Sequence, residues 1–273
     1  MSLDAAAGLL ACPHCGGALG VESPAARCER GHSFDVARQG YLNLLGGGQP
    51  ANADTAGMLT ARGRVLASGR FDPLLSLVAE HTRGAQRVLE VGSGTAHYLR
   101  HCLADAPAAR GIALDVSVAA ARLAAKADPR IAAVVADVWR GLPVLDHSLN
   151  AVVCVFAPRN LAEFVRVLRP DGRLVVLTPN AGHLAALRRH HGLLGIEPEK
   201  DERLLAATRE FFDLRTTSRV RIPVELSPEL AADVIAMGPN AFHHAATPQL
   251  PVADHLDATL RVFEPIAGPA GGQ

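Results

Sequence analysis

The sequence predicts an α/β protein with a mostly parallel sheet, preceded by a small module that contains several cysteines and glycines. From residue 86 onward, short apolar runs alternate with longer amphipathic stretches, the pattern of parallel strands joined by helices on both faces of a sheet. Before that, three of the five cysteines fall within the first 28 residues, and Gly46-Gly47-Gly48 marks a break.

These patterns divide the chain into three expected parts. Residues 1–45 form the small module, which includes an aromatic-containing segment at 33–45. Residues 46–83 form a connector, and residues 84–273 form the α/β domain. We expect the connector to be helical because its apolar residues recur at helical spacing: Met58, Leu59, Val65, Leu66, Leu74, Leu75 and Val78.

Within the α/β domain, strands and helices should alternate. We expect strands at Arg87–Val91, Gly111–Asp115, Ile131–Ala136, Ala151–Phe156 and Arg173–Thr178. The first two should be followed by helices near 95–106 and 118–127. The remainder adds a strand near 216–224, a helix near 228–237 and a last strand near 258–263.

Composition and charge exclude several classes of protein. Of the 273 residues, 49% are hydrophobic and 20% are charged, which favours a packed core over disorder. The chain lacks an apolar run of about 18 residues, and its first ten residues do not resemble a signal peptide, so we expect a cytoplasmic protein without a membrane partner. The formal net charge is zero, which argues against a broadly basic surface but allows a local basic patch.

Cysteine and histidine residues in the small module have the spacing of a metal site. Cys12-Pro-His-Cys15 is followed after twelve residues by Cys28, and His32 lies four residues further. Three thiolates and one imidazole suit tetrahedral zinc, and four protein ligands leave no open position, so we predict structural zinc. The alternatives are a redox-active CxxC and the use of His14 in place of His32.

A turn with two glycines follows the first strand of the α/β domain. Gly92 and Gly94 allow a ligand to approach the backbone closely, a pattern shared with dinucleotide-binding folds. Glu90, before the glycines, would repel a pyrophosphate but attract an ammonium group, and Ala96-His97 stands where a third glycine would be expected. We therefore expect S-adenosylmethionine as cofactor, with its methionine moiety at this turn and His97 among the binding residues.

Acidic residues end the next two strands. Asp115 can accept hydrogen bonds from both ribose hydroxyls, and Asp137 can accept one from the adenine amino group. Trp139 is a candidate to cover the adenine face. The alternatives are helix capping or a turn for the two aspartates and core packing for Trp139.

Several segments together carry a family resemblance that covers nearly the whole chain: Cys12–Cys15 with Cys28, Gly31–Leu45, Met58 with Ala61-Arg62, Asp115, Phe156-Ala-Pro-Arg-Asn160, Leu168–Gly172, and Thr178-Pro179 with His183-Leu184. In these segments the chain resembles the 23S rRNA guanine-N1 methyltransferases, including the type that confers resistance to tylosin-like macrolides. The resemblance implies a Rossmann-like class I methyltransferase with a seven-stranded sheet, S-adenosylmethionine, structural zinc and a dimer that grips a 23S rRNA hairpin. Phe242 departs from it, because tryptophan is expected there.

The segment Phe156–Asn160 follows the fourth strand, where a target base would arrive. Methylation of guanine N1 requires loss of the N1 proton and alignment of the base with the methyl donor. Arg159 is a candidate donor to guanine O6 or to a phosphate, and Asn160 a candidate reader of the Watson–Crick edge. His183 is a possible proton acceptor, with an ordinary surface histidine as the equal alternative.

Two other functions remain open at this stage. A small-molecule methyltransferase is favoured slightly by the neutral charge but disfavoured by the zinc module and the long family resemblance. A non-catalytic zinc-dependent RNA-binding protein is disfavoured by the intact glycine turn and Asp115. Candidate phosphate contacts, each equally explained as a solvated polar side chain, are Arg27, Arg30 and Arg38 in the module and Arg62, Arg64 and Arg70 in the connector. The sequence does not identify the guanine, the general base, or a role in resistance as opposed to housekeeping.

Overall fold

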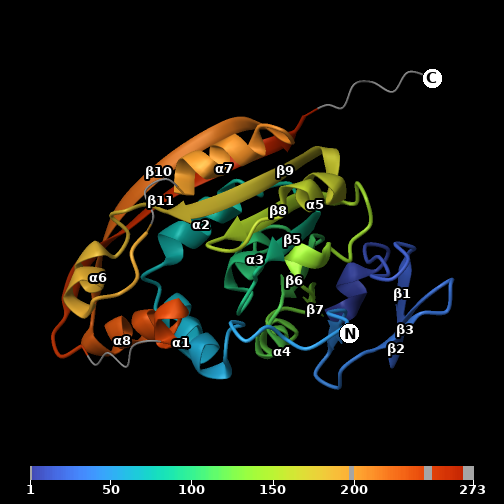
Figure 1. The fold of residues 1–273 in the computed structure, drawn as a ribbon, viewed down its shortest axis with the longest axis horizontal. Helices are drawn as coiled ribbons and strands as arrows, with labels where there is room; N and C mark the ends of the chain where they lie inside the picture. The colour runs from blue at the N-terminus through green and yellow to red at the C-terminus, as the bar shows by residue number, and fades with distance from the viewer. Residues whose placement is uncertain (1, 197–199, 243–247, 267–273) are drawn as a thin grey trace.

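A central sheet of eight strands organises the structure, a computed structural model that describes residues 2–196, 200–242 and 248–266. The strand order is β10-β11-β9-β8-β5-β6-β7-β4 (Figure 1). Neighbouring strands from β9 to β4 are parallel, whereas β11 is antiparallel to both β9 and β10. The strands span Tyr41–Asn43 (β4), Arg87–Val91 (β5), Arg110–Asp115 (β6), Ile131–Val135 (β7), Leu149–Val155 (β8), Leu168–Pro179 (β9), Phe212–Leu226 (β10) and Val252–Pro265 (β11).

The prediction of a mostly parallel α/β sheet is confirmed, and all five expected parallel strands are present. Because β5 to β8 are covered on both faces, their side chains are almost all apolar and buried. The carboxyl ends of β5, β6, β7 and β8 meet at one edge of the sheet, because these strands are parallel. This edge carries the glycine turn and the segments after β6, β7 and β8.

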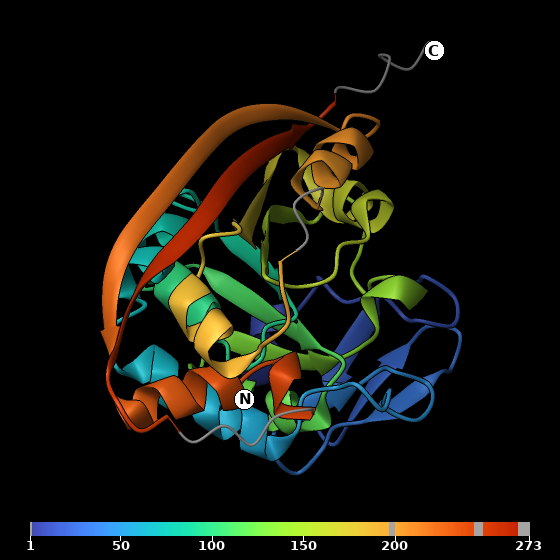
Figure 2. The ribbon, with the colours of Figure 1, turned by 60° about the vertical axis from the view of Figure 1, so that its left-hand side comes forward.

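Helices cover both faces of the sheet (Figures 1 and 2). One face packs against helices of the connector, of the first half of the α/β domain and of the C-terminal part, and the other against η1, α5 and α7. The helices span Ala56–Ala67 (α1), Asp72–Glu80 (α2), His97–Cys102 (α3), Val118–Ala124 (α4), Leu161–Val167 (α5), Ala185–His191 (α6), Lys200–Thr208 (α7) and Pro228–Ala236 (α8), with 3-10 turns at Ser2–Ala6 (η1), Val138–Arg140 (η2) and Pro239–Phe242 (η3).

The connector is helical, as predicted, and it packs on the domain that follows it. Helix α1 begins at the N-cap Thr55, whose side chain accepts a hydrogen bond from the backbone N–H of Met58. Its apolar face lies against α8, so the connector joins the C-terminal part of the chain. Helix α3 begins two residues later than expected, because Ala96 adopts a left-handed conformation with φ of 56°, and it ends at Cys102, four residues before the expected end.

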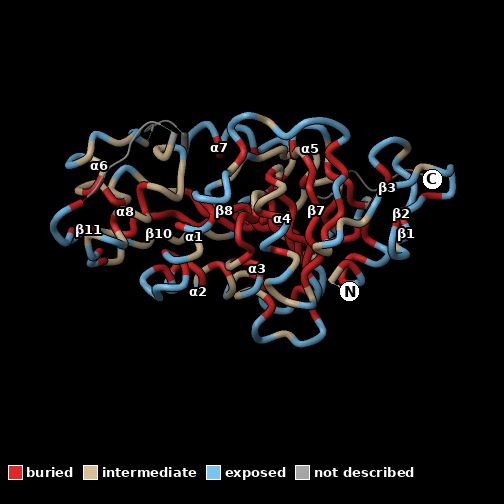
Figure 3. The backbone as a smooth tube through the Cα atoms, turned by 90° about the horizontal axis from the view of Figure 1, so that it is seen from below, coloured by how far each residue is buried: buried red, intermediate tan, exposed pale blue. Residues whose placement is uncertain are grey.

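The N-terminal module has its own small antiparallel sheet of β1 (Leu19–Glu22), β2 (Ala25–Cys28) and β3 (Ser33–Asp35). Strand β4, however, belongs to the central sheet, where it pairs in parallel with β7. The family resemblance implied seven strands, and β4 is an eighth at the edge. Apolar side chains of the module, such as Leu10 and Leu42, share a core with Leu114 and Val134 of the central sheet. In Figure 3 the exposed hairpins of the module extend from the buried centre of the molecule.

The opposite end of the sheet is formed by β10 and β11, which pair along 14 residue positions and are longer than the sequence indicated. Helices α6 and α7 were not expected. Phe242, the departure from the family pattern, ends η3, and its side chain lies outside the described part of the chain. Among the described residues, none of the helices is long and apolar enough to cross a membrane.

Candidate functional site

The four predicted metal ligands lie together. Their donor atoms, the thiolates of Cys12, Cys15 and Cys28 and a ring nitrogen of His32, all lie within 4.8 Å of one another. Nδ1 of His32 is 3.5 Å from Sγ of Cys12 and 3.3 Å from Sγ of Cys28. Three thiolates and an imidazole at these distances fit a tetrahedral zinc ion. The alternative ligand His14 instead stacks on Phe34, with ring centroids 5.5 Å apart.

The glycine turn after β5 is held against the end of β6. The backbone N–H groups of Gly92 and Ser93 both donate to the carbonyl of Leu114, at 2.9 and 3.1 Å. Oγ of Ser93 is buried and lacks a hydrogen-bond partner within the described ranges 2–196, 200–242 and 248–266. An unpartnered buried hydroxyl beside a glycine turn fits a polar ligand that lies along the backbone.

Both glycines of this turn have positive φ, 66° at Gly92 and 50° at Gly94. A Cβ at Gly92 would lie 2.6 Å from the Cβ of Ala157, and one at Gly94 would lie 2.7 Å from Nη1 of Arg62. The backbone is therefore closely covered by the segment after β8 on one side and by the connector on the other. Both positions therefore require glycine, because a side chain at either one would overlap Ala157 or Arg62.

Gly92→Ala should destabilise the protein by roughly 2–4 kcal/mol, because alanine is strained in the left-handed conformation and its Cβ would overlap Ala157. Urea unfolding followed by circular dichroism measures this change. Gly63→Ala is the matched control: Gly63 lies in α1 with open space around a Cβ, and its replacement should stabilise by up to about 1 kcal/mol. Equal stability of Gly92→Ala and the wild type would contradict the described turn.

Asp115 lies at the centre of the turn, as its position at the end of β6 predicted. One carboxylate oxygen accepts from the backbone N–H of Gly94 and the other from that of Ser117, both at 2.8 Å. Burial raises the pKa of Asp115, although these two hydrogen bonds oppose the shift. The carboxylate thus faces both the glycine turn and the start of α4, which fits contact with ribose hydroxyls.

Glu90 lies near the end of β5, immediately before the glycine turn, and its side chain points into the protein. Its side chain is only 2% exposed, and Oε2 accepts from the backbone N–H of Leu99 at 3.1 Å. Burial raises the pKa of Glu90 to about 8. His97 follows the turn: its Nδ1 lies 2.8 Å from Oγ1 of Thr95, and burial lowers its pKa. Both residues adjoin the turn, and their contact with the cofactor stays a prediction.

The raised pKa of Glu90 predicts a pH dependence of stability. An unfolded glutamate ionises near pH 4.5, whereas folded Glu90 keeps its proton up to about pH 8. Between these values the folded state binds more protons, so the free energy of unfolding should fall as pH rises, by up to about 1.4 kcal/mol per pH unit. Between pH 6.5 and 8, the free energy of unfolding of the wild type should therefore fall by about 2 kcal/mol more than that of Glu90→Gln. Urea unfolding of both proteins at pH 6.5 and pH 8 checks this difference. An equal change in the free energy of unfolding for the two proteins would contradict it.

Asp137 and Trp139 follow β7, also at this edge. Oδ1 of Asp137 accepts from the backbone N–H of Trp139 at 3.0 Å, so Asp137 caps the turn η2, the alternative considered for it. Trp139 is 64% exposed, which excludes core packing. The remaining interpretations of this indole are contact with the adenine or with another ligand at the surface.

The segment after β8 forms the wall of the site on the other side. Phe156 has a φ of 52° and is 43% exposed, an unusual conformation for an aromatic residue. Nη1 of Arg159 donates to the carbonyl of Ala157 at 3.4 Å. Asn160 is engaged structurally: Nδ2 donates to the carbonyl of Val138 at 2.9 Å, and Oδ1 accepts from the backbone N–H of Glu163. Asn160 therefore joins η2 to the start of α5.

His183 lies next to Phe156, with ring centroids 5.6 Å apart. Burial lowers the pKa of His183 to about 4, so its ring is neutral at pH 7. Nδ1 is buried and has no hydrogen-bond partner among residues whose placement the structure gives. The structure thus brings His183 and Phe156 together at the carboxyl edge, although they are 27 positions apart in the sequence.

The connector contributes residues that sequence reasoning missed. Arg62 was a candidate phosphate contact, but its Nη1 lies against Gly94 and 2.5 Å from Oδ2 of Asp54. Arg64 is paired with Asp233 on α8. Arg62 is thus engaged in a partly buried ion pair, whereas the side chain of Arg64 is 59% exposed, and the contact of both with RNA stays a prediction. No sequence signal distinguished Arg62 from its neighbours, since the contact joins segments about 30 residues apart.

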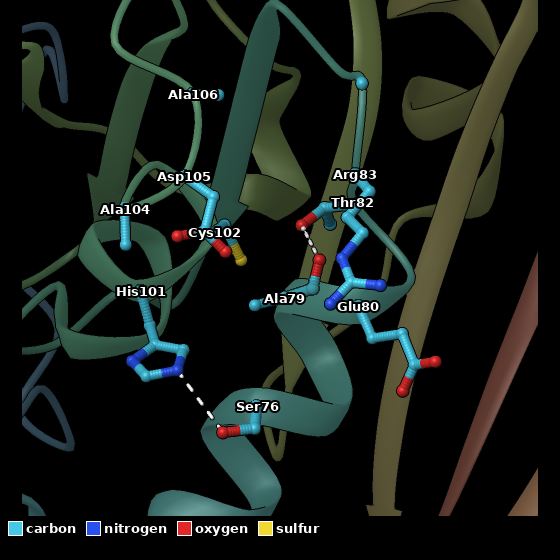
Figure 4. Close-up of a pocket in the computed structure, with 11 residues that line it drawn as sticks. Ser76, Ala79, Glu80, Thr82, Arg83, His101, Cys102, Ala104, Asp105 and Ala106 are labelled. Atoms are coloured by element: carbon cyan, nitrogen blue, oxygen red, sulfur yellow. Dashed lines mark hydrogen bonds between the residues drawn. The ribbon is translucent and has the colours of Figure 1, made fainter.

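A separate cavity of about 260 Å³ lies between α2 and α3 and is lined by Ser76, Glu80, His101 and Cys102 (Figure 4). It is near the loop that leads into the amino end of β6, at the opposite edge of the sheet from the glycine turn. Burial raises the pKa of Cys102 to about 12, so its thiol is unreactive. This cavity takes no part in the site.

Two family models match parts of the chain. Residues 10–49 match the model of the RlmA N-terminal zinc ribbon, and residues 88–172 match a methyltransferase domain. The first match contains all four cysteine and histidine residues of the metal cluster, and the second contains the glycine turn and Asp115.

Whole-chain relatives agree with these matches. A 23S rRNA (guanine(748)-N(1))-methyltransferase of Streptomyces fradiae is 41% identical over 240 residues, covering 86% of each chain. A Micromonospora griseorubida relative, which also bears a 23S rRNA (guanine-N(1)-)-methyltransferase name, is 41% identical over 256 residues, covering 86% of this chain and 87% of its own. A solved structure described as "Conversion of a Disulfide Bond into a Thioacetal Group during Echinomycin Biosynthesis" aligns with a TM-score of 0.51 at 15% identity, over 72% of this chain and 83% of that one. This last likeness concerns the fold alone.

Proposed function

Because the chain belongs to the 23S rRNA (guanine-N1)-methyltransferase family, we propose that it transfers a methyl group from S-adenosylmethionine to N1 of a guanine in a hairpin of 23S rRNA. We also propose that the protein acts in the cytoplasm and that a homodimer binds the hairpin. The residues that bind the cofactor and the guanine are also part of this proposal. Resistance to a macrolide would follow if the methylated guanine lies at a drug site.

The observation that carries the proposal is the continuity between the zinc ribbon and the methyltransferase site. Leu10 of the ribbon forms a bridge with Val144, just after η2, and the backbone N–H of Ala11 donates to the carbonyl of Pro143. Turn η2 is in turn fixed to the segment after β8 by the Nδ2 hydrogen bond of Asn160. The ribbon is therefore joined through the segment 138–144 to the wall of the methyltransferase site, as a substrate that contacts both parts requires.

At the cofactor end of the site, different residues would hold the methionine, ribose and adenine groups of S-adenosylmethionine. When bound, this cofactor supplies a methyl group on a positively charged sulfur. The turn at Gly92 and Gly94 would contact its methionine moiety, Asp115 at the end of β6 would accept hydrogen bonds from the ribose, and Asp137 would accept one from the adenine amino group. Trp139 is the proposed cover of the adenine.

At the base end, positioning supplies most of the rate. Phe156 and the neutral ring of His183 form one side of the proposed base pocket. The low pKa of His183 makes it a weak proton acceptor, so we assign it to orienting the base. Arg159 donates to guanine O6, where negative charge develops as the N1 proton leaves. Asn160, whose amide is engaged with the backbone, acts through the position of η2.

RNA affinity in this proposal comes from local arginines, because the net charge is zero. Arg27, Arg30 and Arg38 of the ribbon are exposed, and so is Arg70 of the connector. These four arginines, which have no ion pair with a carboxylate among the described residues, are the proposed phosphate contacts. Guanine N1 is hidden by Watson–Crick pairing, so the target base must be unpaired or flipped.

A label-transfer experiment tests the function. Purified protein is incubated with S-adenosylmethionine carrying a labelled methyl group and with unmodified 23S rRNA, 16S rRNA or no RNA. Label should enter 23S rRNA only, and Asp115→Ala should reduce its incorporation when S-adenosylmethionine is limiting. Absence of label from all three samples would contradict the proposal, and RNA binding without transfer would indicate a binding protein.

A further inference from the structure

An ion pair lies directly over the glycine turn. Nη1 of Arg62, on α1, is 2.5 Å from Oδ2 of Asp54, and a Cβ on Gly94 would lie 2.7 Å from the same nitrogen. The side chains of Arg62 and Asp54 are 24% and 22% exposed, so the pair is neither fully solvated nor sealed in the core. It faces the backbone where the methionine moiety of the cofactor is proposed to bind.

Both members of the pair are held in place by the fold. Nη2 of Arg62 donates to the carbonyl of Met237, at the end of α8, at 2.6 Å. The carbonyl of Asp54 accepts from Oγ of Ser117 at 2.7 Å, next to Asp115 at the end of β6. The connector is therefore attached to the same strand end that presents the proposed ribose acceptor. This arrangement fixes a cation and an anion side by side against a glycine.

We propose that Arg62 and Asp54 form the receptor for the amino-acid end of S-adenosylmethionine, with Arg62 binding the α-carboxylate and Asp54 the α-ammonium. This inference rests on the proposed function. An amino-acid zwitterion presents one negative and one positive group on the same carbon, and a guanidinium beside a carboxylate complements both. When the ligand is absent, the two receptor groups pair with each other.

Glu90, which the sequence suggested for the ammonium, is less suited to that role. Its carboxylate is 2% exposed, accepts from the backbone N–H of Leu99, and retains its proton up to about pH 8 because burial raises its pKa. A neutral, buried acid attracts a cation weakly. Asp54 is more accessible and is already paired with a cation, so it can exchange that partner for the ammonium.

Three ligands separate the two halves of the receptor in isothermal titration calorimetry with the full-length protein. S-adenosylhomocysteine carries both charged groups, S-adenosyl-3-thiopropylamine keeps only the ammonium, and 5′-methylthioadenosine has neither. Arg62→Met should weaken the binding of S-adenosylhomocysteine about 10- to 100-fold, because charge-assisted hydrogen bonds to the carboxylate are lost. It should not weaken the binding of the other two ligands. Asp54→Asn should weaken the binding of both amine-containing ligands and leave the affinity for 5′-methylthioadenosine unchanged.

Arg64→Met is the matched control, since Arg64 lies on the same helix but pairs with Asp233, and it should change none of the three affinities. If Arg62→Met and Asp54→Asn weaken 5′-methylthioadenosine as much as S-adenosylhomocysteine, the pair only supports the fold, and the receptor is overturned. If the wild type binds none of the ligands, the cofactor assignment fails as well. The expected pattern without methylation of 23S rRNA would establish the receptor and reject only the RNA substrate.

Discussion

Removal of zinc is expected to weaken the whole chain, and not only the N-terminal ribbon. Strands β1, β2 and β3 contain three or four residues each, too few to form a stable core alone. Cross-linking by the four ligands must therefore supply much of the ribbon's stability, and structural zinc sites contribute on the order of 10 kcal/mol. Cys12 and Cys28 share a core with Leu114 and Val134 of the central sheet, so disorder in the ribbon also exposes that core.

Chelation, or Cys28→Ser, should accordingly lower the unfolding temperature by more than about 10 °C. Hydrogen exchange should become faster both at residues 10–36 and in β7, the strand that pairs with β4. Cys102→Ser is the control, because Cys102 lies outside the metal cluster. An unchanged unfolding temperature after the metal has been shown to leave would contradict a structural role for zinc.

Loss of cofactor affinity is the second large effect that we expect. Asp115→Asn should weaken S-adenosylhomocysteine binding about 10- to 100-fold, because an amide accepts at only one oxygen and carries no charge. In the wild type, the two carboxylate oxygens accept hydrogen bonds from Gly94 and Ser117, so both sides of the proposed ribose site depend on this one side chain.

Calorimetry measures this loss, and thermal unfolding in the absence of ligand shows whether the variant remains folded. Asp105→Asn, at an exposed position in the loop before β6, is the matched control and should bind like the wild type. An Asp115→Asn variant that is folded and binds with unchanged affinity would refute the placement of the ribose.

The sequence predicted those features that depend on local pattern. Apolar runs identified the five parallel strands, and the positions of Asp115 and Asp137 at strand ends placed them at one edge of the sheet. The CxxC spacing brought the four metal ligands together without any knowledge of the fold. These features are encoded by residues close together in the chain, or follow from the geometry of parallel strands.

Features that depend on contacts between distant segments were missed. Strand β4 joins the central sheet through β7, about 90 residues later, and its three residues give no periodic signal. Arg62 was interpreted as a phosphate contact because the sequence does not reveal that α1 lies over the glycine turn. The hydrogen bond of the Asn160 amide to Val138 also joins segments that are separated in the sequence. The exposure of Trp139 was missed because the turn η2 that carries it is too short to predict.

The central claim is that the methyl group reaches N1 of one guanine in 23S rRNA. Unmodified 23S rRNA is incubated with the protein and S-adenosylmethionine, and primer extension then maps the positions at which reverse transcription stops. We expect one new stop at a guanine, absent without cofactor and weaker with Asp115→Ala at limiting cofactor, and 1-methylguanosine in the nucleoside digest of that fragment. Stops at many positions, no stop at all, or a methyl group on another atom of the base would contradict it.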